Sequence, residues 1–136
     1  MLPQFRKNFS KMSVFKDQIT RIVQSVPSGS VLSYGQVAAY TGLPRAARQV
    51  GLVLREMEED VPWWRVVNNS GRVSITGNWR ADKLLQSKLL CSEGVEVGSD
   101  FTFVIEKYRF RPTDEQLKEF QLESDYREKV MLKYQL

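Results

Sequence analysis

The chain has 136 residues, 42% of them apolar, and a net charge of +4, which is typical of one soluble globular domain with at most a short extension. It has no His and one Cys, Cys91, so we expect no disulfide within the chain, no metal site and no cofactor. No apolar run approaches the roughly 18 residues of a membrane span, and the N-terminus lacks the apolar core of a signal peptide; we therefore expect an intracellular protein, cytoplasmic in a prokaryote or nuclear in a eukaryote.

Basic residues are concentrated in the first third of the chain. Residues 1–26 contain a single acid, Asp17, and residues 27–55 contain none. The basic residues in these two ranges are Arg6, Lys7, Lys11, Lys16, Arg21, Arg45, Arg48 and Arg55. A polyanion such as DNA would bind to this distribution of charge, although a solvated basic surface would look the same.

The first predicted element is a helix that begins at Ser13, after a basic N-terminal arm at residues 1–12 that we expect to be loose. Ser13 can cap a helix, and the turn residues at 27–29 end it. The apolar residues between them recur at helical spacing: Phe15, Ile19, Ile22, Val23 and Val26.

A helix-turn-helix is predicted next. Ser33 and Gln36 form the pattern of a capping box, and the run Thr-Gly-Leu-Pro at residues 41–44 ends this second helix. A third helix is expected from about Arg45 to Met57. Its buried residues would be Val50, Val53, Leu54 and Met57. The small Ala46 and Ala47 would let this helix approach a surface closely, although alanine also simply favours helix.

A hairpin is expected after the third helix. Residues 65–67 and 72–75 are short strand-like runs, and Asn-Asn-Ser-Gly at residues 68–71 is typical of the turn between them. A fourth helix follows from near Arg80 to Ser92, with Gly94 as its C-terminal cap. Its inward residues would be Leu84, Leu85, Leu89 and Leu90.

The remainder predicts a strand and a last helix. Apolar residues alternate over 95–105, which indicates strand. Thr113 and Gln116 form a second capping box, and the helix that they begin runs nearly to the end of the chain. We expect its apolar side to pack on the domain; the alternative is a docking surface for a partner.

Together these elements predict an α+β, mostly helical fold. A winged helix-turn-helix DNA-binding domain would occupy residues 13–111, between the N-terminal arm at 1–12 and a C-terminal helix at 112–136.

Three runs of residues carry a family resemblance over about Phe15 to Val97. They are Ser-Tyr-Gly-Gln-Val-Ala at 33–38, Ala-Arg-Gln-Val-Gly at 47–51 and Pro-Trp-Trp-Arg-Val-Val at 62–67. In order and spacing they resemble the C-terminal domain of alkylguanine-DNA alkyltransferases, which implies that type of winged-helix domain.

The resemblance departs from the family at its reactive pair. The family motif is Pro-Cys-His-Arg-Val, whose Cys takes the alkyl group and whose His helps to activate it; here Trp63 and Trp64 stand at these positions. An indole is neither nucleophile nor base in this chemistry. A Trp at the first position is typical of alkyltransferase-like proteins, which bind alkylated guanine without repairing it. Glu93 matches the acid that orients the family's His, and we expect it to have nothing to orient.

The resemblance implies roles for individual residues. Tyr34 would press on the phosphate beside the target and help to rotate the nucleotide out, Arg48 would fill the space that the base leaves, and Ala46 and Ala47 would let the third helix lie in the minor groove. The implied DNA-binding residues are Tyr34, Arg45, Ala46, Ala47, Arg48 and Gln49. The implied flipped-base pocket is Trp63, Trp64, Arg65, Val73, Ser74, Thr76, Trp79 and Arg80, in which the loop from Val73 to Arg80 closes over the base.

These residues indicate a non-enzymatic DNA-damage sensor with no catalytic residue. It would bind O-alkylguanine in double-stranded DNA as a monomer, flip the base without removing the alkyl group, and flag the site for nucleotide excision repair proteins. One alternative is a winged-helix DNA-binding protein without lesion preference, in which Trp63 and Trp64 are only core aromatics. Another is a divergent alkyltransferase that uses Cys91, although this thiol is expected to pack as a small hydrophobe.

Overall fold

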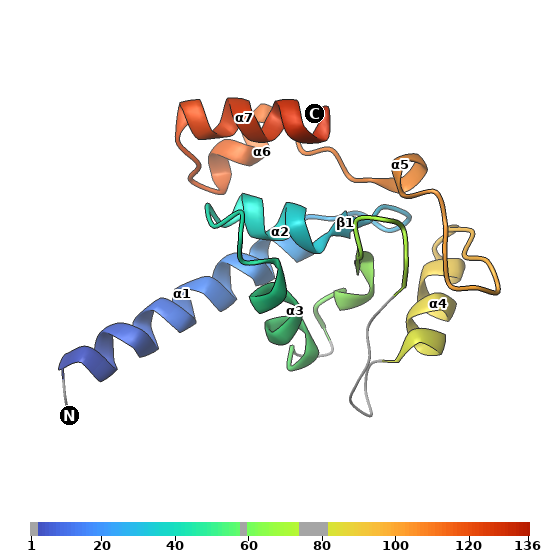
Figure 1. The fold of residues 1–136 in the computed structure, drawn as a ribbon, viewed down its shortest axis with the longest axis horizontal. Helices are drawn as coiled ribbons and strands as arrows, with labels where there is room; N and C mark the ends of the chain where they lie inside the picture. Colours follow the sequence, from blue (N-terminus) through green and yellow to red (C-terminus); the bar gives the residue numbers. More distant parts are fainter. Residues whose placement is uncertain (1–2, 58–59, 74–81) are drawn as a thin grey trace.

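The computed structural model describes residues 3–57, 60–73 and 82–136, with side chains described from residue 13 onward (Figure 1). None of the helices in these ranges is long and apolar enough to cross a membrane. The described elements are α1 (Pro3–Gln24), β1 (Leu32–Ser33), α2 (Tyr34–Tyr40), α3 (Ala47–Arg55), the 3-10 helix η1 (Trp63–Arg65), β2 (Val66–Val67), α4 (Lys83–Ser92), α5 (Ile105–Tyr108), α6 (Asp114–Glu119) and α7 (Ser124–Tyr134).

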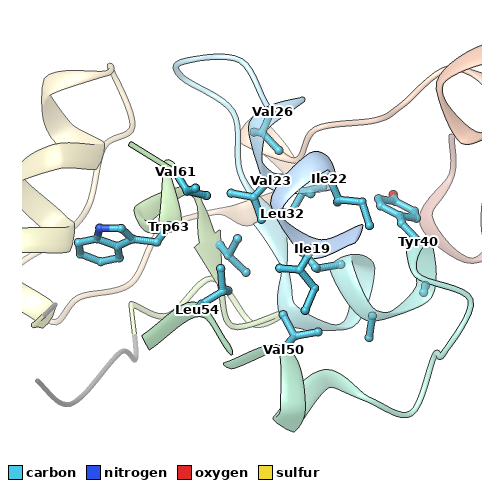
Figure 2. Close-up of a cluster of buried hydrophobic side chains, with 14 of the residues drawn as sticks. Ile19, Ile22, Val23, Val26, Leu32, Tyr40, Val50, Leu54, Val61 and Trp63 are labelled. Carbon is cyan, nitrogen blue, oxygen red and sulfur yellow. The ribbon is translucent and has the colours of Figure 1, made fainter. Parts of the chain in front are cut away.

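Helix α1 begins at Pro3 rather than at Ser13, so the segment expected to be a loose arm has a helical backbone. Proline is favoured at the first position of a helix, and no Gly or Pro follows before residue 27 to interrupt it. The predicted inner face is confirmed, because Ile19, Ile22, Val23 and Val26 are fully buried. Figure 2 shows these side chains facing Leu32 and Val50 in one cluster.

The helix-turn-helix is present as α2 and α3. Ser33 Oγ accepts a hydrogen bond from the Gln36 backbone N–H at 3.0 Å, and the Ser33 N–H donates to Gln36 Oε1 at 3.1 Å, so the predicted capping box is confirmed. Gly42 adopts φ +87° after the end of α2, a conformation that glycine tolerates best. Val50 and Leu54 bury the inner side of α3 as expected.

The strand pairing differs from the predicted hairpin. The turn at residues 68–71 forms, with the Gly71 N–H donating to Asn68 O at 2.9 Å, but β2 pairs in parallel with β1, matching Leu32 to Val66. Beyond the turn, Arg72 pairs with Thr102 instead of with β2. Val66 and Val67 are both buried, so they lie beside the equally buried β1 rather than in an exposed wing. Ser74 and Ile75, the rest of the predicted second strand, lie outside the described residues.

The predicted strand over residues 95–105 is wrong. A tight turn interrupts it, because the Gly98 N–H donates to Thr102 O and Asp100 Oδ1 accepts from the Thr102 N–H. Residues 105–108 then form α5. The alternating apolar residues of this segment still face inward, whereas Val104 is exposed. Val95 and Ile105 belong to a second buried cluster, and Val97, Phe101 and Phe103 pack against it; the other buried members are Val31, Val67, Val73 and Leu90.

Helix α4 buries an unexpected side chain. Leu90 is buried as predicted, but Leu84 and Leu85 are exposed, and Gln86 takes the inward place. The Gln86 amide donates to Trp64 O and Val66 O, each at 3.0 Å, so it satisfies two backbone carbonyls that an aliphatic side chain could not. Gly94 follows the helix with φ +93°, as its predicted role requires.

The predicted C-terminal helix is two helices, α6 and α7, with Gln121 in the left-handed region (φ +66°) between them. The Thr113–Gln116 capping box is confirmed. Both helices pack on α2, on the side away from α3 (Figure 1). Phe120 stacks on Tyr40 at 5.8 Å between ring centroids, and the Tyr126 hydroxyl donates to Ala39 O at 2.6 Å. The apolar side therefore belongs to the core, as expected, and is covered without a partner.

We predict that Leu117→Ala lowers the free energy of unfolding by about 2–4 kcal/mol, because it removes a fully buried side chain from this core. Leu132 of α7 is 81% exposed, so Leu132→Ala should change the free energy of unfolding by less than about 0.5 kcal/mol. Urea denaturation measures both. Equal, small effects would mean that α6 does not share the core.

Candidate nucleic-acid interface

Tyr34 and the arginines of α3 form the candidate DNA-binding surface. Tyr34 is the first residue of α2, immediately after the capping Ser33. A Cβ added at Gly51 of α3 would lie 3.8 Å from Tyr34 Cε1, so the half-buried Tyr34 ring packs against α3. Gly51 is three residues after Arg48 in the sequence. The structure thus packs Tyr34, to which the resemblance assigns a phosphate contact, against the helix that carries Arg48, to which it assigns the filling of the duplex.

The other predicted contact residues surround this pair. Arg45, Arg48 and Gln49 are exposed, whereas Ala46 and Ala47 are half-buried against the core. Sequence reasoning missed Leu52, whose side chain is 53% exposed one helical turn after Arg48. Leu52 could have been found from the sequence, because residues four apart in a helix lie on the same face and it follows Arg48 by four. The small residues at the start of α3, with the exposed Arg45 and Arg48, suit close approach to a nucleic-acid groove.

Trp63 lies at the edge of the main core. It is only 8% exposed, and Figure 2 shows its indole at the side of the cluster, pointing away from Val23 and Leu32. Its ring meets that of Trp64 edge-on, at 5.9 Å between centroids and 88° between planes. Trp64 is less buried and contacts both apolar clusters. The two indoles therefore form one aromatic corner between the main core and α4.

A carboxylate holds this corner in place. Trp64 Nε1–H donates to Glu93 Oε1 at 3.0 Å, and the Arg65 guanidinium forms a two-pronged ion pair with the same carboxylate. Arg65 also lies over the Trp64 ring, 5.5 Å from its centroid, and donates to Val26 O at 2.8 Å. The expectation that Glu93 would have nothing to orient is wrong, because an indole N–H can donate a hydrogen bond as an imidazole N–H can.

Glu93 is ionised in this arrangement. Burial of its carboxylate acts to raise the pKa, but hydrogen bonds from Arg65, Trp64 and Ser28, with the positive charge of Arg65, outweigh burial and hold the pKa of Glu93 below its ordinary value. The side chains of Arg65 and Glu93 are 15% and 10% exposed, so the pair is largely shielded from solvent. The position of Trp64 therefore depends on a charged partner.

The rest of the predicted pocket is placed in part. Val73 is fully buried among Val31, Val67 and Leu90. Ser74, Thr76, Trp79 and Arg80 lie outside the described residues, so the pocket as a whole stays a prediction. Gln86 was missed because no local pattern marks it. Among the described residues, neither its buried Oε1 nor the buried Ser87 hydroxyl has a hydrogen-bond partner, whereas its Nε2 is bonded to Trp64 O at the aromatic corner.

Two further residue types bear on the chemistry. Cys91 is exposed rather than packed as a small hydrophobe. In the part of the chain that the structure describes, no three Cys, Asp or Glu side chains lie together as metal ligands would.

We predict that Glu93→Gln lowers the free energy of unfolding at pH 7 by about 2 kcal/mol, because it leaves the Arg65 guanidinium without its counter-charge. A depressed native pKa stabilises the fold above the unfolded pKa, and this contribution is lost as pH falls through the native value. Stability of the wild type should therefore decline below about pH 5 more steeply than that of Glu93→Gln. Urea denaturation followed by Trp fluorescence measures both, with exposed Glu96→Gln as the control. If the free energies of unfolding of the wild type and Glu93→Gln fall equally as the pH is lowered, the prediction is contradicted.

Comparison with known proteins gives consistent matches. Residues 14–95 match the 6-O-methylguanine DNA methyltransferase, DNA binding domain family. The chain is 41% identical over 111 residues to a DNA base-flipping protein of Escherichia coli K12, which covers 80% of this chain and 83% of that protein. It is 37% identical over 89 residues to alkyltransferase-like protein 1 of Schizosaccharomyces pombe, covering 64% of this chain and 82% of that protein.

A solved structure is similar as well. The crystal structure of S. pombe Atl1 in complex with damaged DNA containing O6-carboxymethylguanine superposes with a TM-score of 0.66 and 32% identity, over 72% of this chain and 95% of that one. These matches confirm the fold class and the resemblance inferred from residues 33–38, 47–51 and 62–67. The chain belongs to the 6-O-methylguanine DNA methyltransferase DNA-binding-domain family, in its alkyltransferase-like, base-flipping branch.

Proposed function

We propose that this protein is a non-enzymatic sensor of alkylated DNA. It binds O-alkylguanine in duplex DNA, rotates the damaged base out of the stack beside Trp63 and Trp64, and leaves the alkyl group in place. The observation that carries this proposal is that the fold keeps Tyr34 packed on the helix of the exposed Arg48 while Trp63 and Trp64, at the positions of the family's reactive pair, form one aromatic corner.

The energetics of base flipping suit these residues. Extruding a base costs a few kcal/mol, and less when alkylation has already weakened its pairing. Arg48 is exposed and can enter the duplex in place of the base, which offsets part of this cost. An aromatic wall contributes roughly 1–3 kcal/mol per stacked base. An alkyl group on the guanine adds apolar area against the indoles, which favours the lesion over unmodified guanine.

The same corner cannot perform alkyl transfer. Neither indole can act as a nucleophile or accept a proton, and Glu93 is committed to Trp64 and Arg65. A bound lesion that is not repaired stays marked by the protein, so we propose that nucleotide excision repair proteins are the partners that act on it. The burial of Trp63 favours one other candidate function, a DNA-binding protein without lesion preference.

Lesion preference is the first prediction of this proposal. A duplex with one O6-methylguanine should bind at least roughly tenfold more tightly, or 1.4 kcal/mol, than the same duplex without it, as measured by fluorescence anisotropy at physiological salt. Arg48→Ala should remove most of this preference, because it leaves the gap in the duplex unfilled. Lys129→Ala, an exposed charge on α7, serves as the control. Equal affinity for both duplexes would support the general DNA-binding protein instead.

A second prediction concerns the alkyl group. After incubation with excess O6-methylguanine duplex, the protein should show no added methyl mass and the DNA should retain its lesion, because no nucleophile lies at position 63. Intact-protein mass spectrometry and digestion of the DNA measure the two. Cys91→Ser is the control: a methyl gain in the wild type that this variant lacks would establish the divergent alkyltransferase.

A further inference from the structure

Arg109 is a buried arginine outside the family-matched region of residues 14–95. Its side chain is 4% exposed. The guanidinium donates to Gln36 Oε1 at 2.6 Å, to Asn69 Oδ1 at 3.1 Å and to Glu106 Oε1 at 2.7 Å. Burying such a charge is unfavourable unless its donors are used, and here they reach three separate parts of the chain.

The bond to Gln36 ties Arg109 to the start of α2. Gln36 Oε1 already accepts the Ser33 N–H as part of the capping box, and Gln36 Nε2 donates to the Tyr40 hydroxyl at 2.9 Å. Tyr34 lies between the two residues of this box. Any movement of the box relative to Arg109 therefore moves the backbone from which Tyr34 projects.

The segment around Arg109 is itself held firmly beside this turn. The Val31 N–H donates to Tyr108 O at 2.9 Å, and the Phe110 N–H donates to Val31 O at 2.7 Å, just before β1. From the other side, Tyr134 of α7 lies 5.7 Å beneath the Arg109 guanidinium. The Tyr134 hydroxyl would be 3.3 Å from a side chain at Gly35, so it packs directly against the first turn of α2.

We propose that Arg109 is a positioning residue for DNA binding. Its guanidinium locks the first turn of α2 to the turn at residues 68–71 and to the C-terminal segment, and so holds Tyr34 in the orientation that engages a DNA phosphate. The inference rests on the proposed function, and it assigns to the C-terminal segment a part in DNA recognition without contact to DNA.

Variants of two neighbouring arginines test this. Arg111 bonds the same Glu106 at 3.0 Å but is 39% exposed, so Arg111→Met is a control that also removes one charge. Arg109→Met leaves no buried acceptor without a hydrogen bond, because Gln36 Oε1 still accepts from the Ser33 N–H and the exposed Glu106 still pairs with Arg111. Arg109→Lys keeps the charge but cannot reach Gln36 and Asn69 together. Should Arg109→Met not fold, Arg109→Lys carries the test.

In anisotropy titrations with the O6-methylguanine duplex, Arg109→Met and Arg109→Lys should each weaken binding about fivefold, and Arg111→Met less than about twofold. The Lys variant should then be combined with Tyr34→Ala and, separately, with Arg48→Ala. Arg109→Lys should not weaken binding further when Tyr34 is already Ala, but it should still weaken binding when Arg48 is Ala. If it weakens binding in both, Arg109 acts through something other than Tyr34 and the proposal is wrong.

Amide hydrogen exchange without DNA separates this inference from the proposed function. The Gln36 N–H, which donates to Ser33 Oγ, should exchange faster in Arg109→Lys than in the wild type or Arg111→Met. Unchanged exchange overturns the inference even if the wild type prefers the lesion. If the Gln36 N–H exchanges faster in Arg109→Lys but the wild type shows no lesion preference, the link from Arg109 to α2 is supported and the proposed function is overturned.

Discussion

The hydrogen-bonded carboxylate of Glu93 joins parts of the chain that are far apart in sequence. Glu93 is the C-cap residue of α4, where its backbone N–H bonds the last turn. Its carboxylate accepts the Trp64 indole N–H and pairs with Arg65, which in turn donates to Val26 O after α1. A shielded carboxylate is unfavourable unless its oxygens are bonded, so the burial of Glu93 requires these segments to come together. The aromatic corner that we propose for the flipped base is one product of this constraint.

Trp64 shows how a family can lose its chemistry and keep its geometry. At the position where the family resemblance implies a His, the indole supplies an N–H donor to Glu93 as an imidazole could, but it cannot accept a proton. Trp63 replaces the nucleophile with a flat apolar surface in a core position. The two changes leave no nucleophile and no base at these positions, and under the proposed function they would leave an aromatic surface for a flipped base.

Helix α2 owes its stability to its neighbours on both sides. It has seven residues, too few to be stable alone, and its residues 36–40 are all buried. Helix α3 covers one side, while α6 and α7 cover the other through Tyr40, Phe120 and Tyr126 (Figure 1). The helix that begins the candidate DNA-binding surface is therefore packed partly against a segment that lies outside the family-matched residues.

The sequence by itself determined the features contained within a few neighbouring residues. Both capping boxes, the Gly94 cap and the absence of a nucleophile at position 63 follow from short runs, because helix ends and side-chain chemistry are local. It also indicated, through family resemblance, separate DNA-binding roles for Tyr34 and Arg48. Only the tertiary structure decided the parallel pairing of β1 with β2, the inward place of Gln86 and the partners of Glu93. These contacts join residues 20 or more positions apart, where competing partners differ in burial and hydrogen bonding rather than in any local pattern.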